Sequence, residues 1–355
     1  MAFTITDILT EYGAYYLKSG QNMSRLKGAL VQPSVTLGKF GTRLFIDDTK
    51  YQMANPIFTS LLQPFRKAFE AKGNVDFHPN VIDLNHLKVD LSLYPHDIEA
   101  SWLGFLAGQD ATQLKNWPIV KYILEQYMVV QVQADKELSA VYKGEYDAEG
   151  DTATDSMDGL KKKLVAASID SKYPCNIITG IGELSAESIF EQIEEYDEAF
   201  DEKYTNIPII HFMSPYWVRQ MKKNKRGKGY YLIESPDQID SGVDFTKHVV
   251  VGLPSMSGTK DIFSTVMQNL ISIVKRPSNK DAVNVDVQVA DRQVKILTDW
   301  WEAVGFGCNQ LIWTTAETVG AADSGSGSAS GSGSSSASAS ASASSSASAS
   351  SSASA

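Results

Sequence analysis

Residues 75–93, VDFHPNVIDLNHLKVDLSL, carry the strongest β-strand pattern in the chain. From Leu87 to Leu93, charged and polar residues alternate with apolar ones, as a strand with one solvent-facing side requires. Turn-forming pairs occur at Pro79-Asn80 and at Asn85-His86. We therefore expect two long strands that turn at one of these pairs and form a projecting β-hairpin. The supporting apolar residues are Val75, Phe77, Val81, Ile82, Leu84, Leu87, Val89, Leu91 and Leu93.

The segments before this stretch predict smaller elements. Residues 3–31 indicate a short helical arm with few core positions. Residues 35–46 indicate a pair of strands separated by a glycine break. Residues 56–72 indicate short helical pieces that Pro64 interrupts.

A long helix is predicted over residues 117–142. Apolar side chains recur there at spacings of three, four and seven residues. Pro118 suits the first turn of a helix, and Gly144 suits its end. About 26 residues at about 1.5 Å each give a helix about 40 Å long.

The second half of the chain mixes helices and strands, and the whole is typical of the α+β class. An acidic loop over 147–158 comes first, but it lacks the glycine and terminal glutamate of a calcium-binding EF-hand. The predicted elements are a helix over 184–204, a strand over 207–212, a basic helix over 215–226, a strand over 248–253, a helix over 260–275 and a β-rich section over 283–313.

Composition excludes several classes of protein. The chain has 355 residues and a formal net charge of -10, which makes general nucleic-acid binding unfavourable. No apolar run approaches the length of a membrane span, and the first residues lack the pattern of a signal peptide. Cys175 and Cys308 are far apart and belong to no metal-type pair, so we expect ordinary thiols in a reducing compartment.

The turn Thr179-Gly180-Ile181-Gly182-Glu183-Leu184-Ser185 partly matches a dinucleotide-binding loop. Ser185 stands where that pattern has its third glycine, and Glu183 would place a negative charge beside the pyrophosphate. A plain turn with Ser185 as the N-cap of the following helix fits the pattern better. A nucleotide-binding enzyme that uses Gly180 and Gly182 is kept as a remote alternative.

No constellation of catalytic or metal-binding residues is found in the sequence. The five histidines are scattered, and no two have metal-ligand spacing. No phosphate-binding P-loop and no Ser/His/Asp or Cys/His pattern occurs. We therefore predict no catalytic residue, no metal site, no cofactor and no enzymatic activity. The histidines are His78, His86, His96, His211 and His248.

A basic cluster stands out in the otherwise acidic chain. Its sequence is MKKNKRGKGYY over 221–231. It could bind nucleic acid, or dock on the glutamate-rich face of 184–204 in another copy, or simply be a solvated helix end. Its charged members are Lys222, Lys223, Lys225, Arg226 and Lys228.

The order of elements resembles the Hong Kong 97-type major capsid protein of tailed bacteriophages: an arm, a long hairpin, a very long helix, a mixed region and a terminal β section. Four segments are similar to parts of that family, and the last resembles capsid proteins of Bacteroidetes phages and prophages. They are Leu87–Leu106, Phe212–Pro215, Val251–Met256 and Val289–Trp301. The resemblance covers most of residues 1–315.

The resemblance implies a division into the parts of that fold. They are an N-terminal arm at 1–34, an E-loop region at 35–110, a spine helix of the peripheral domain at 111–150, an axial domain at 151–282, a closing β section at 283–322 and a disordered Ser/Ala/Gly tail at 323–355.

The resemblance also implies a function. It predicts a structural subunit that assembles with itself, through pentamers and hexamers, into an icosahedral head around double-stranded DNA. The expected partners are a separate scaffolding protein, a portal, and packaged DNA that is bound only weakly and non-specifically, with no membrane. The expected location is the virion, after assembly in the cytoplasm of a bacterial host. An encapsulin-like bacterial shell protein shares the fold and is the alternative.

Candidate contacts between subunits follow from this picture. The arm and the hairpin have too few core positions to fold alone, so we expect both to become ordered on assembly. The charged rims of the hairpin should meet neighbouring copies, and the basic cluster should lie at an axial contact. No lysine–asparagine cross-link can be matched, so we expect a non-covalent shell. The candidates are Arg43, Lys88, Asp90, Asp97, Lys222, Lys223, Lys225, Arg226 and Lys228.

The tail after Asp323 should be dispensable for assembly. Residues 324–355 are only serine, alanine and glycine, so they cannot bury enough apolar surface to fold. A chain truncated after Asp323 is expected to form the same particles as the full chain in electron micrographs. Loss of particles in the truncated chain would contradict this prediction.

Overall fold

The chain divides into two units, Met1–Asp323 and Ser324–Ala355. The computed structural model describes parts of the first unit. The predicted arm, the start of the predicted long helix and the tail lie outside the described residues. Those residues are 34–58, 60–94, 99, 102, 127–228, 241–244, 246–276, 283–290 and 293–320.

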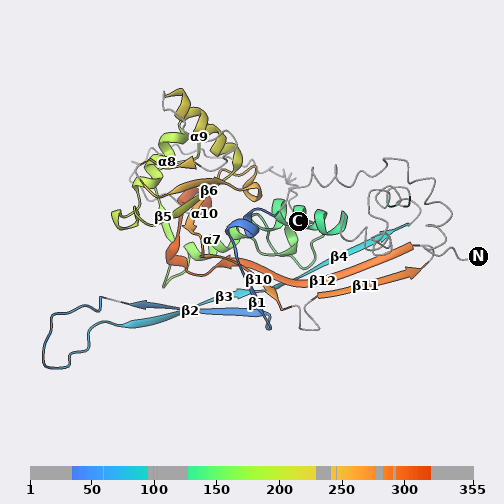
Figure 1. Ribbon diagram of the computed structural model, residues 1–355, viewed down its shortest axis with the longest axis horizontal. Coiled ribbons are helices and arrows are strands. Elements are labelled where there is room, and N and C mark those ends of the chain that lie inside the picture. The colour runs from blue at the N-terminus through green and yellow to red at the C-terminus, as the bar shows by residue number, and fades with distance from the viewer. Residues whose placement is uncertain are drawn as a thin grey trace, which may run out of the picture. The chain divides into compact units, whose positions relative to one another are not determined.

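A five-stranded sheet is organised around the longest strand, β12 (Gln293–Phe306). Its first part lies between β11 (Val283–Ala290) and β4 (Asn85–Leu93), both antiparallel to it. Its last residues pair with β10 (Leu270–Lys275), which pairs in parallel with β1 (Thr42–Ile46). Figure 1 shows β4, β12 and β11 running side by side. The β-rich section predicted over 283–313 is confirmed.

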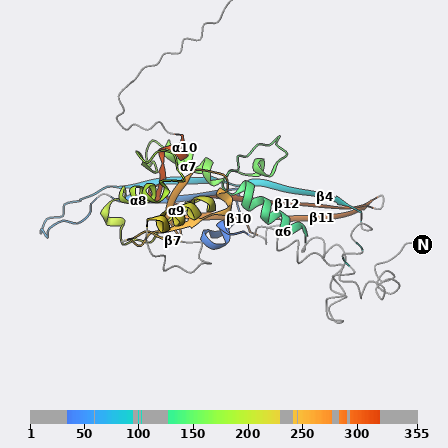
Figure 2. The ribbon, with the colours of Figure 1, turned by 90° about the horizontal axis from the view of Figure 1, so that it is seen from above.

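The projecting hairpin exists, but its strands differ from those predicted. It consists of β2 (Lys50–Phe58) and β3 (Val75–Asp83), antiparallel from Lys50 opposite Asp83 to Phe58 opposite Val75. Figures 1 and 2 both show it extending away from the sheets. The predicted turns within 75–93 are wrong, because the chain passes from β3 to β4 through the single buried residue Leu84 without reversing.

Two further predictions near the hairpin are wrong. The helical pieces expected over 56–72 are absent, since 56–58 belong to β2 and residues 60–72 contain neither helix nor strand. Pro64 leaves pieces too short to hold a helix without packing partners, and residues 60–72 are all exposed. The strand pair expected over 35–46 is a π-helical turn, Thr36–Phe40, followed by β1 alone.

The described part of the predicted long helix is helical from 127 to 140. It contains α6 (Val129–Asp135) and a π-helical turn (Lys136–Ala140). Beyond its end, Val141 and Tyr142 are fully buried. They share a core with Leu160, Leu164 and Ala167 of α7 (Leu160–Ser168), a helix that was not predicted from the sequence. This helical region forms one core with both sheets.

A second sheet has six strands in the order β5, β13, β9, β6, β8, β7. The helices α8 (Ile189–Glu198) and α9 (Pro215–Gly227) pack on it and share its second core. The predicted strands over 207–212 and 248–253 and the predicted basic helix are confirmed, each within a few residues. The strands are β5 (Asn176–Ile178), β13 (Ile312–Thr315), β9 (Ile262–Val266), β6 (Ile209–Met213), β8 (Val249–Gly252) and β7 (Ser241–Gly242), and α10 (Ala316–Val319) follows β13.

The helix predicted over 260–275 is wrong, because this segment forms β9 and β10. β9 belongs to the six-stranded sheet and β10 to the five-stranded sheet, so the segment connects the two. Nearly all of its strand residues are buried, and such a run has no period that distinguishes a strand from a helix. Asn269 shapes the turn between the strands by donating to the Thr265 hydroxyl and to the Cys308 carbonyl, both at 2.9 Å.

The helix predicted over 184–204 is shorter than expected. It is divided into α8 and a separate 3-10 turn, Glu202–Tyr204. Ser188, rather than Ser185, occupies the N-cap position. The Ser185 N–H instead donates to the Gln192 side chain at 2.9 Å, so Ser185 belongs to the preceding turn.

Candidate assembly surfaces

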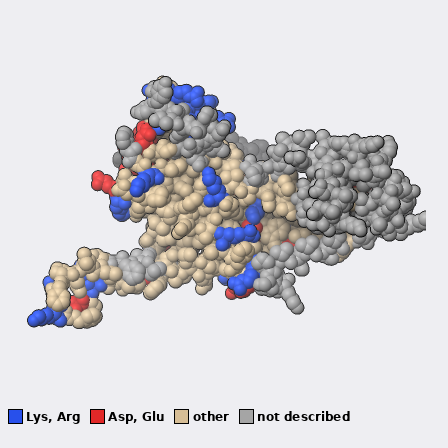
Figure 3. Space-filling view, viewed as in Figure 1, with Lys and Arg blue, Asp and Glu red and all other residues tan. Residues whose placement is uncertain are grey.

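The far end of the hairpin is an apolar surface that the described chain leaves open. Residues 60–74 connect β2 to β3, and every one of them is exposed. Leu62 is 88% exposed, Phe65 92% and Phe69 94%. Aromatic side chains with this exposure mark an interaction site, since a soluble monomer rarely gathers them on its surface. Figure 3 shows this end of the hairpin as a mostly uncharged surface with a few charged groups.

Polar contacts within the tip give the connection a definite form. Arg66 pairs with Glu70 at 2.9 Å, and Gln63 donates to the Glu70 carbonyl at 3.0 Å. Lys72 donates to the Leu62 carbonyl from the other side of the connection. The apolar side chains are therefore held on an arranged loop.

The base of the hairpin is attached to the five-stranded sheet. Asn55 donates to the Gly307 carbonyl at 2.8 Å, and Asn80 donates to the Phe306 carbonyl at 2.6 Å. Ile82 is buried against Gly305, where a Cβ would lie 2.8 Å from the Ile82 Cδ1. These contacts set the direction in which the hairpin leaves the body.

The predicted basic cluster lies on the second half of α9, and Figure 3 shows its positive charge over that helix. Lys225 is buried and bound to Asp244 at 3.0 Å. Lys228 pairs with Glu191 of α8. The glutamate-rich helix and the basic helix thus meet within one chain, whereas the sequence analysis had considered a contact between copies. Lys223 and Arg226 are exposed, and Lys222 is half-buried.

Three further predicted contact residues, Arg43, Lys88 and Asp90, belong to strands other than those of the hairpin. Arg43 is exposed on β1, where its guanidinium lies 5.1 Å from the Phe45 ring centroid. Lys88 and Asp90 are exposed on β4 and pair with each other at 3.2 Å. Asp97 lies outside the described residues. The expectation that Lys88 and Asp90 line the hairpin is wrong, because β4 pairs with β12.

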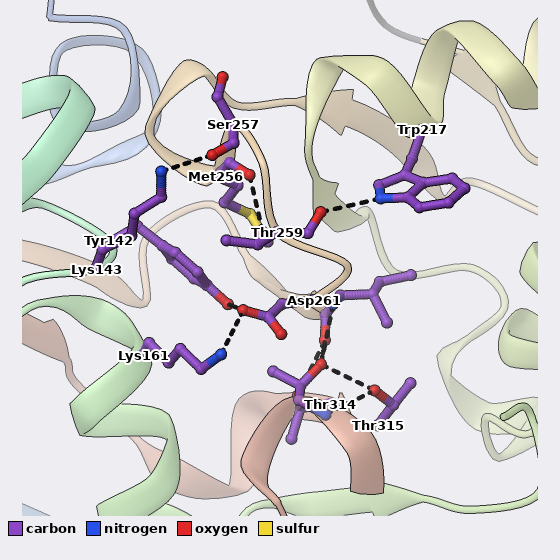
Figure 4. A network of polar contacts seen from close by, with 12 residues as sticks. Tyr142, Lys143, Lys161, Trp217, Met256, Ser257, Thr259, Asp261, Thr314 and Thr315 are labelled. Carbon is purple, nitrogen blue, oxygen red and sulfur yellow. Dashed lines mark hydrogen bonds and ion pairs between the residues drawn. The ribbon is translucent and has the colours of Figure 1, made fainter. Parts of the chain in front are cut away.

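A connected polar network joins the helical region to the six-stranded sheet (Figure 4). Asp261 accepts a hydrogen bond from the Tyr142 hydroxyl at 3.0 Å and an ion pair from Lys161 of α7 at 2.9 Å. Burial, together with the negative charge of Asp261, raises the pKa of Tyr142 well above its ordinary value. Tyr142 therefore stays neutral and remains a donor.

Backbone carbonyls of the loop before β9 extend this network. Lys143 donates to the Ser257 carbonyl at 2.6 Å, and the indole N–H of Trp217 in α9 donates to the Thr259 carbonyl at 2.9 Å. In Figure 4 the two contacts reach the loop from opposite sides. The loop therefore links the end of the long helix to α9.

Replacing Asp261 with alanine is expected to lower the free energy of unfolding by about 1–3 kcal/mol, because the buried Tyr142 hydroxyl loses its acceptor. Lys161→Ala is the control. Its side chain is 44% exposed, and such a pair contributes about 1 kcal/mol or less. Urea denaturation of the unassembled chain measures both. Equal losses in the two variants would contradict the role assigned to Tyr142.

The turn at Gly180 and Gly182 does not form a phosphate-binding loop. Both glycines have positive φ values, 92° and 70°. Gln192 of α8 fills the turn, since its side-chain amide donates to the Ile181 carbonyl at 3.2 Å and its oxygen accepts from the Ser185 N–H. The backbone donor that a phosphate would need is thus already bound. The geometry offers the nucleotide-binding alternative no support.

The structure brings together two histidines that the sequence analysis treated as scattered. His211 of β6 and His248, which precedes β8, both contact the Asp197 carboxylate of α8, and all three side chains are buried. Their contacting atoms lie within 4.8 Å of one another. No sequence spacing signals this cluster, because it depends on the pairing of β6 with β8.

Membrane insertion finds no support in the described helices: none of them has both the length and the apolar composition to cross a bilayer. The free thiols differ in burial. Cys175 is buried, which raises its pKa to about 11, and Cys308 is half-buried.

Comparison with known proteins identifies the fold. No protein-family model matches the chain, and no curated protein sequence matches it. Among solved structures, the chain is similar to a protein of the satellite phage P4 procapsid that includes the size determination protein. The TM-score is 0.50 at 10% identity, with 82% of this chain and 98% of that chain covered.

A second similar structure is the capsid of an empty GTA particle. Its TM-score is 0.47 at 12% identity, and 80% of this chain and 97% of that chain are covered. The P4 likeness, with the projecting hairpin, the helical stretch 127–140 and the two sheets described above, supports the conclusion. The described chain has the α+β Hong Kong 97-like capsid fold that the sequence analysis predicted.

Proposed function

We propose that this protein is a major capsid protein, which assembles with itself through pentamers and hexamers into an icosahedral phage head around double-stranded DNA. The observation that carries the proposal is the open apolar tip of the β2–β3 hairpin on a Hong Kong 97-like fold. Three large apolar side chains held in solvent at the end of a projecting hairpin have a physical reason to exist if another copy covers them.

The charge of the chain supports this role. A head protein surrounds dense DNA and must not hold it tightly, and a chain with net charge -10 repels a polyanion. The charges of Lys225 in α9 and of Lys228, which follows that helix, are already paired with acidic groups of the same chain. The packaged DNA is therefore a weak and non-specific partner in this proposal.

The remaining parts of the proposal concern partners and place. A separate scaffolding protein and a portal are the proposed assembly partners, and the virion is the proposed location, reached from the host cytoplasm. We also propose that the chain comes from a phage or prophage of Bacteroidetes, which the resemblance of Val289–Trp301 to capsid proteins of that group supports. The proposed domain limits are those implied by the family resemblance.

Expression of residues 1–355, alone and with the neighbouring genes, followed by negative-stain electron microscopy, tests the proposal. Closed shells, or rings of five and six subunits, are expected. Shells that protect DNA from nuclease support a phage head, whereas shells that hold a co-expressed enzyme support the encapsulin-like alternative. A monodisperse monomer under all conditions would overturn the proposal.

A further inference from the structure

A buried cluster of polar side chains lies between α8 and the six-stranded sheet. Asp197 is 7% exposed, His248 2% and His211 not at all. Ser264 of β9 and the carbonyl of Tyr204 complete the cluster. The chain thus buries a carboxylate and two imidazoles, and buried polar groups are satisfied by protein partners, so each of their protons is assigned to one of these contacts.

The protonation of His211 follows from its two neighbours. Its Nε2 lies 2.9 Å from the Asp197 Oδ1, which only accepts, so Nε2 carries a proton. Its Nδ1 lies 2.6 Å from the Ser264 hydroxyl, which can donate. When the Ser264 hydroxyl donates to His211, its oxygen can accept from the Tyr196 hydroxyl, 2.8 Å away. A neutral His211 satisfies every one of these contacts.

His248 has a different pair of neighbours. Its Nδ1 contacts the same Asp197 oxygen, and its Nε2 lies 3.1 Å from the Tyr204 backbone carbonyl. A carboxylate and a carbonyl can only accept hydrogen bonds. Both ring nitrogens of His248 must therefore carry protons, which makes the ring an imidazolium cation.

We propose that His248 is a buried imidazolium whose ion pair with Asp197 acts as a pH-controlled latch between α8 and the strand β8. Loss of either proton leaves a nitrogen lone pair facing an acceptor oxygen. The contact to Asp197 or the contact to Tyr204 then becomes repulsive. The latch is a property of the folded chain and does not depend on the proposed capsid function.

The charged and titratable groups around His248 agree with this assignment. Burial lowers the pKa of His248, but hydrogen bonds to Asp197 and the Tyr204 carbonyl outweigh it and leave that pKa raised. Burial lowers the pKa of His211 by more than the hydrogen bond and the charge of Asp197 raise it, so the pKa of His211 stays below its ordinary value. Burial opposes the charge of Asp197, but hydrogen bonds from both histidines lower its pKa to about 2.

Among the described residues, Asp197 is the one charged side chain that shifts the pKa of His248. α8 supplies Tyr196, whose pKa is raised above its ordinary value by burial, so that it stays neutral. Cys175, close enough to act on Tyr196, is neutral for the same reason. The Phe200 ring lies 5.6 Å from both imidazoles and covers them. Asp197 is the one carboxylate among these groups.

The pH dependence has a definite sign. Because the folded state holds the His248 proton more tightly, its stabilisation is complete below about pH 6.5 and is lost as the pH rises through the raised pKa. His211 acts in the opposite direction, since its contribution is lost as the pH falls below about 6.5. The contacts of His248 with Asp197 and Tyr204 are therefore weakened when the pH rises above the raised pKa of His248.

Nitrogen-15 NMR of the histidine-labelled full chain, followed from pH 6 to 9, tests the proposal. Carbon-13 at the tyrosine carbonyls identifies His248 through its contact with Tyr204. We expect most of His248 to carry protons on both ring nitrogens at pH 6.5, the ordinary pKa of an imidazole, and His211 to carry a single proton, on Nε2. A His248 that is mostly neutral at pH 6.5 would overturn the proposal.

A variant and a metal titration complete the test. The free energy of unfolding of the wild-type chain should fall from pH 6.5 to pH 9, and His248→Gln should lose most of that fall. An unchanged dependence of the free energy of unfolding on pH in the variant would contradict the latch.

Addition of zinc chloride should leave the NMR signals of His248 in place, whereas displacement of the Nδ1 proton by zinc would show a metal site instead. The wild-type spectrum decides the matter even if the variant does not fold.

Discussion

Replacing Leu62, Phe65 and Phe69 together with serine is expected to abolish shell formation while the unassembled chain keeps its thermal stability. These side chains are 88%, 92% and 94% exposed, so the described fold gains almost nothing from them. If a neighbouring copy covers them, each contributes about 1.5–3 kcal/mol to the contact, or about 5–9 kcal/mol for the three. A loss of that size is many powers of ten in an association constant.

Electron microscopy and thermal denaturation of the triple variant measure the two effects separately. Ile169→Ser is the matched control, because Ile169 is an apolar residue that is 78% exposed and lies after α7, outside the tip residues 60–74. The control should form shells in normal yield. Normal shells from the triple variant would show that the hairpin tip is not an assembly contact.

Replacing Gly144 with alanine is expected to lower the free energy of unfolding by about 3 kcal/mol or more. A Cβ at this position would lie 2.3 Å from the Met157 carbonyl oxygen and 2.4 Å from the Ala140 carbonyl oxygen. Both are backbone atoms, and Ala140 and Met157 are themselves buried, so neither oxygen can move without disturbing the first core.

Gly38→Ala is the control for this prediction, since a Cβ there would meet no atom within 4 Å. Its effect should stay within about 0.5 kcal/mol. Urea denaturation of both unassembled variants gives the comparison. A Gly144→Ala chain as stable as the wild type would contradict the close packing described at the end of the long helix.

The sequence predicted the elements whose pattern is local. The alternation from Leu87 to Leu93 is the pattern of β4, which has one wet side along its length. The run from Pro215 shows an N-terminal proline followed by helical spacing, and α9 begins at that residue. The order of the elements along the chain predicted the fold, although no single segment is specific enough to do so.

Predictions failed where tertiary pairing decides the outcome. Nearly all strand residues within 260–275 are buried, so the apolar pattern of this segment could not distinguish the strands β9 and β10 from a helix. The hairpin was misplaced because Pro79 reads as a turn residue. It is accommodated within β3, which pairs with β2 on one side only.

The buried cluster shows the limit of sequence analysis for sites. His211 and His248 meet through the parallel pairing of β6 and β8, and Asp197 reaches them from α8. Their distances along the chain contain no sign of this arrangement. The same holds for Asp261, whose partner Tyr142 lies 119 residues earlier in the chain.

Cryo-electron microscopy of particles formed by the full chain tests the central claim most directly. We expect a closed shell of pentamers and hexamers, in which residues 61–69 of each hairpin tip are buried against a neighbouring copy. Particles in which the tips of all subunits project into solvent, or a protein that forms no particles, would contradict it.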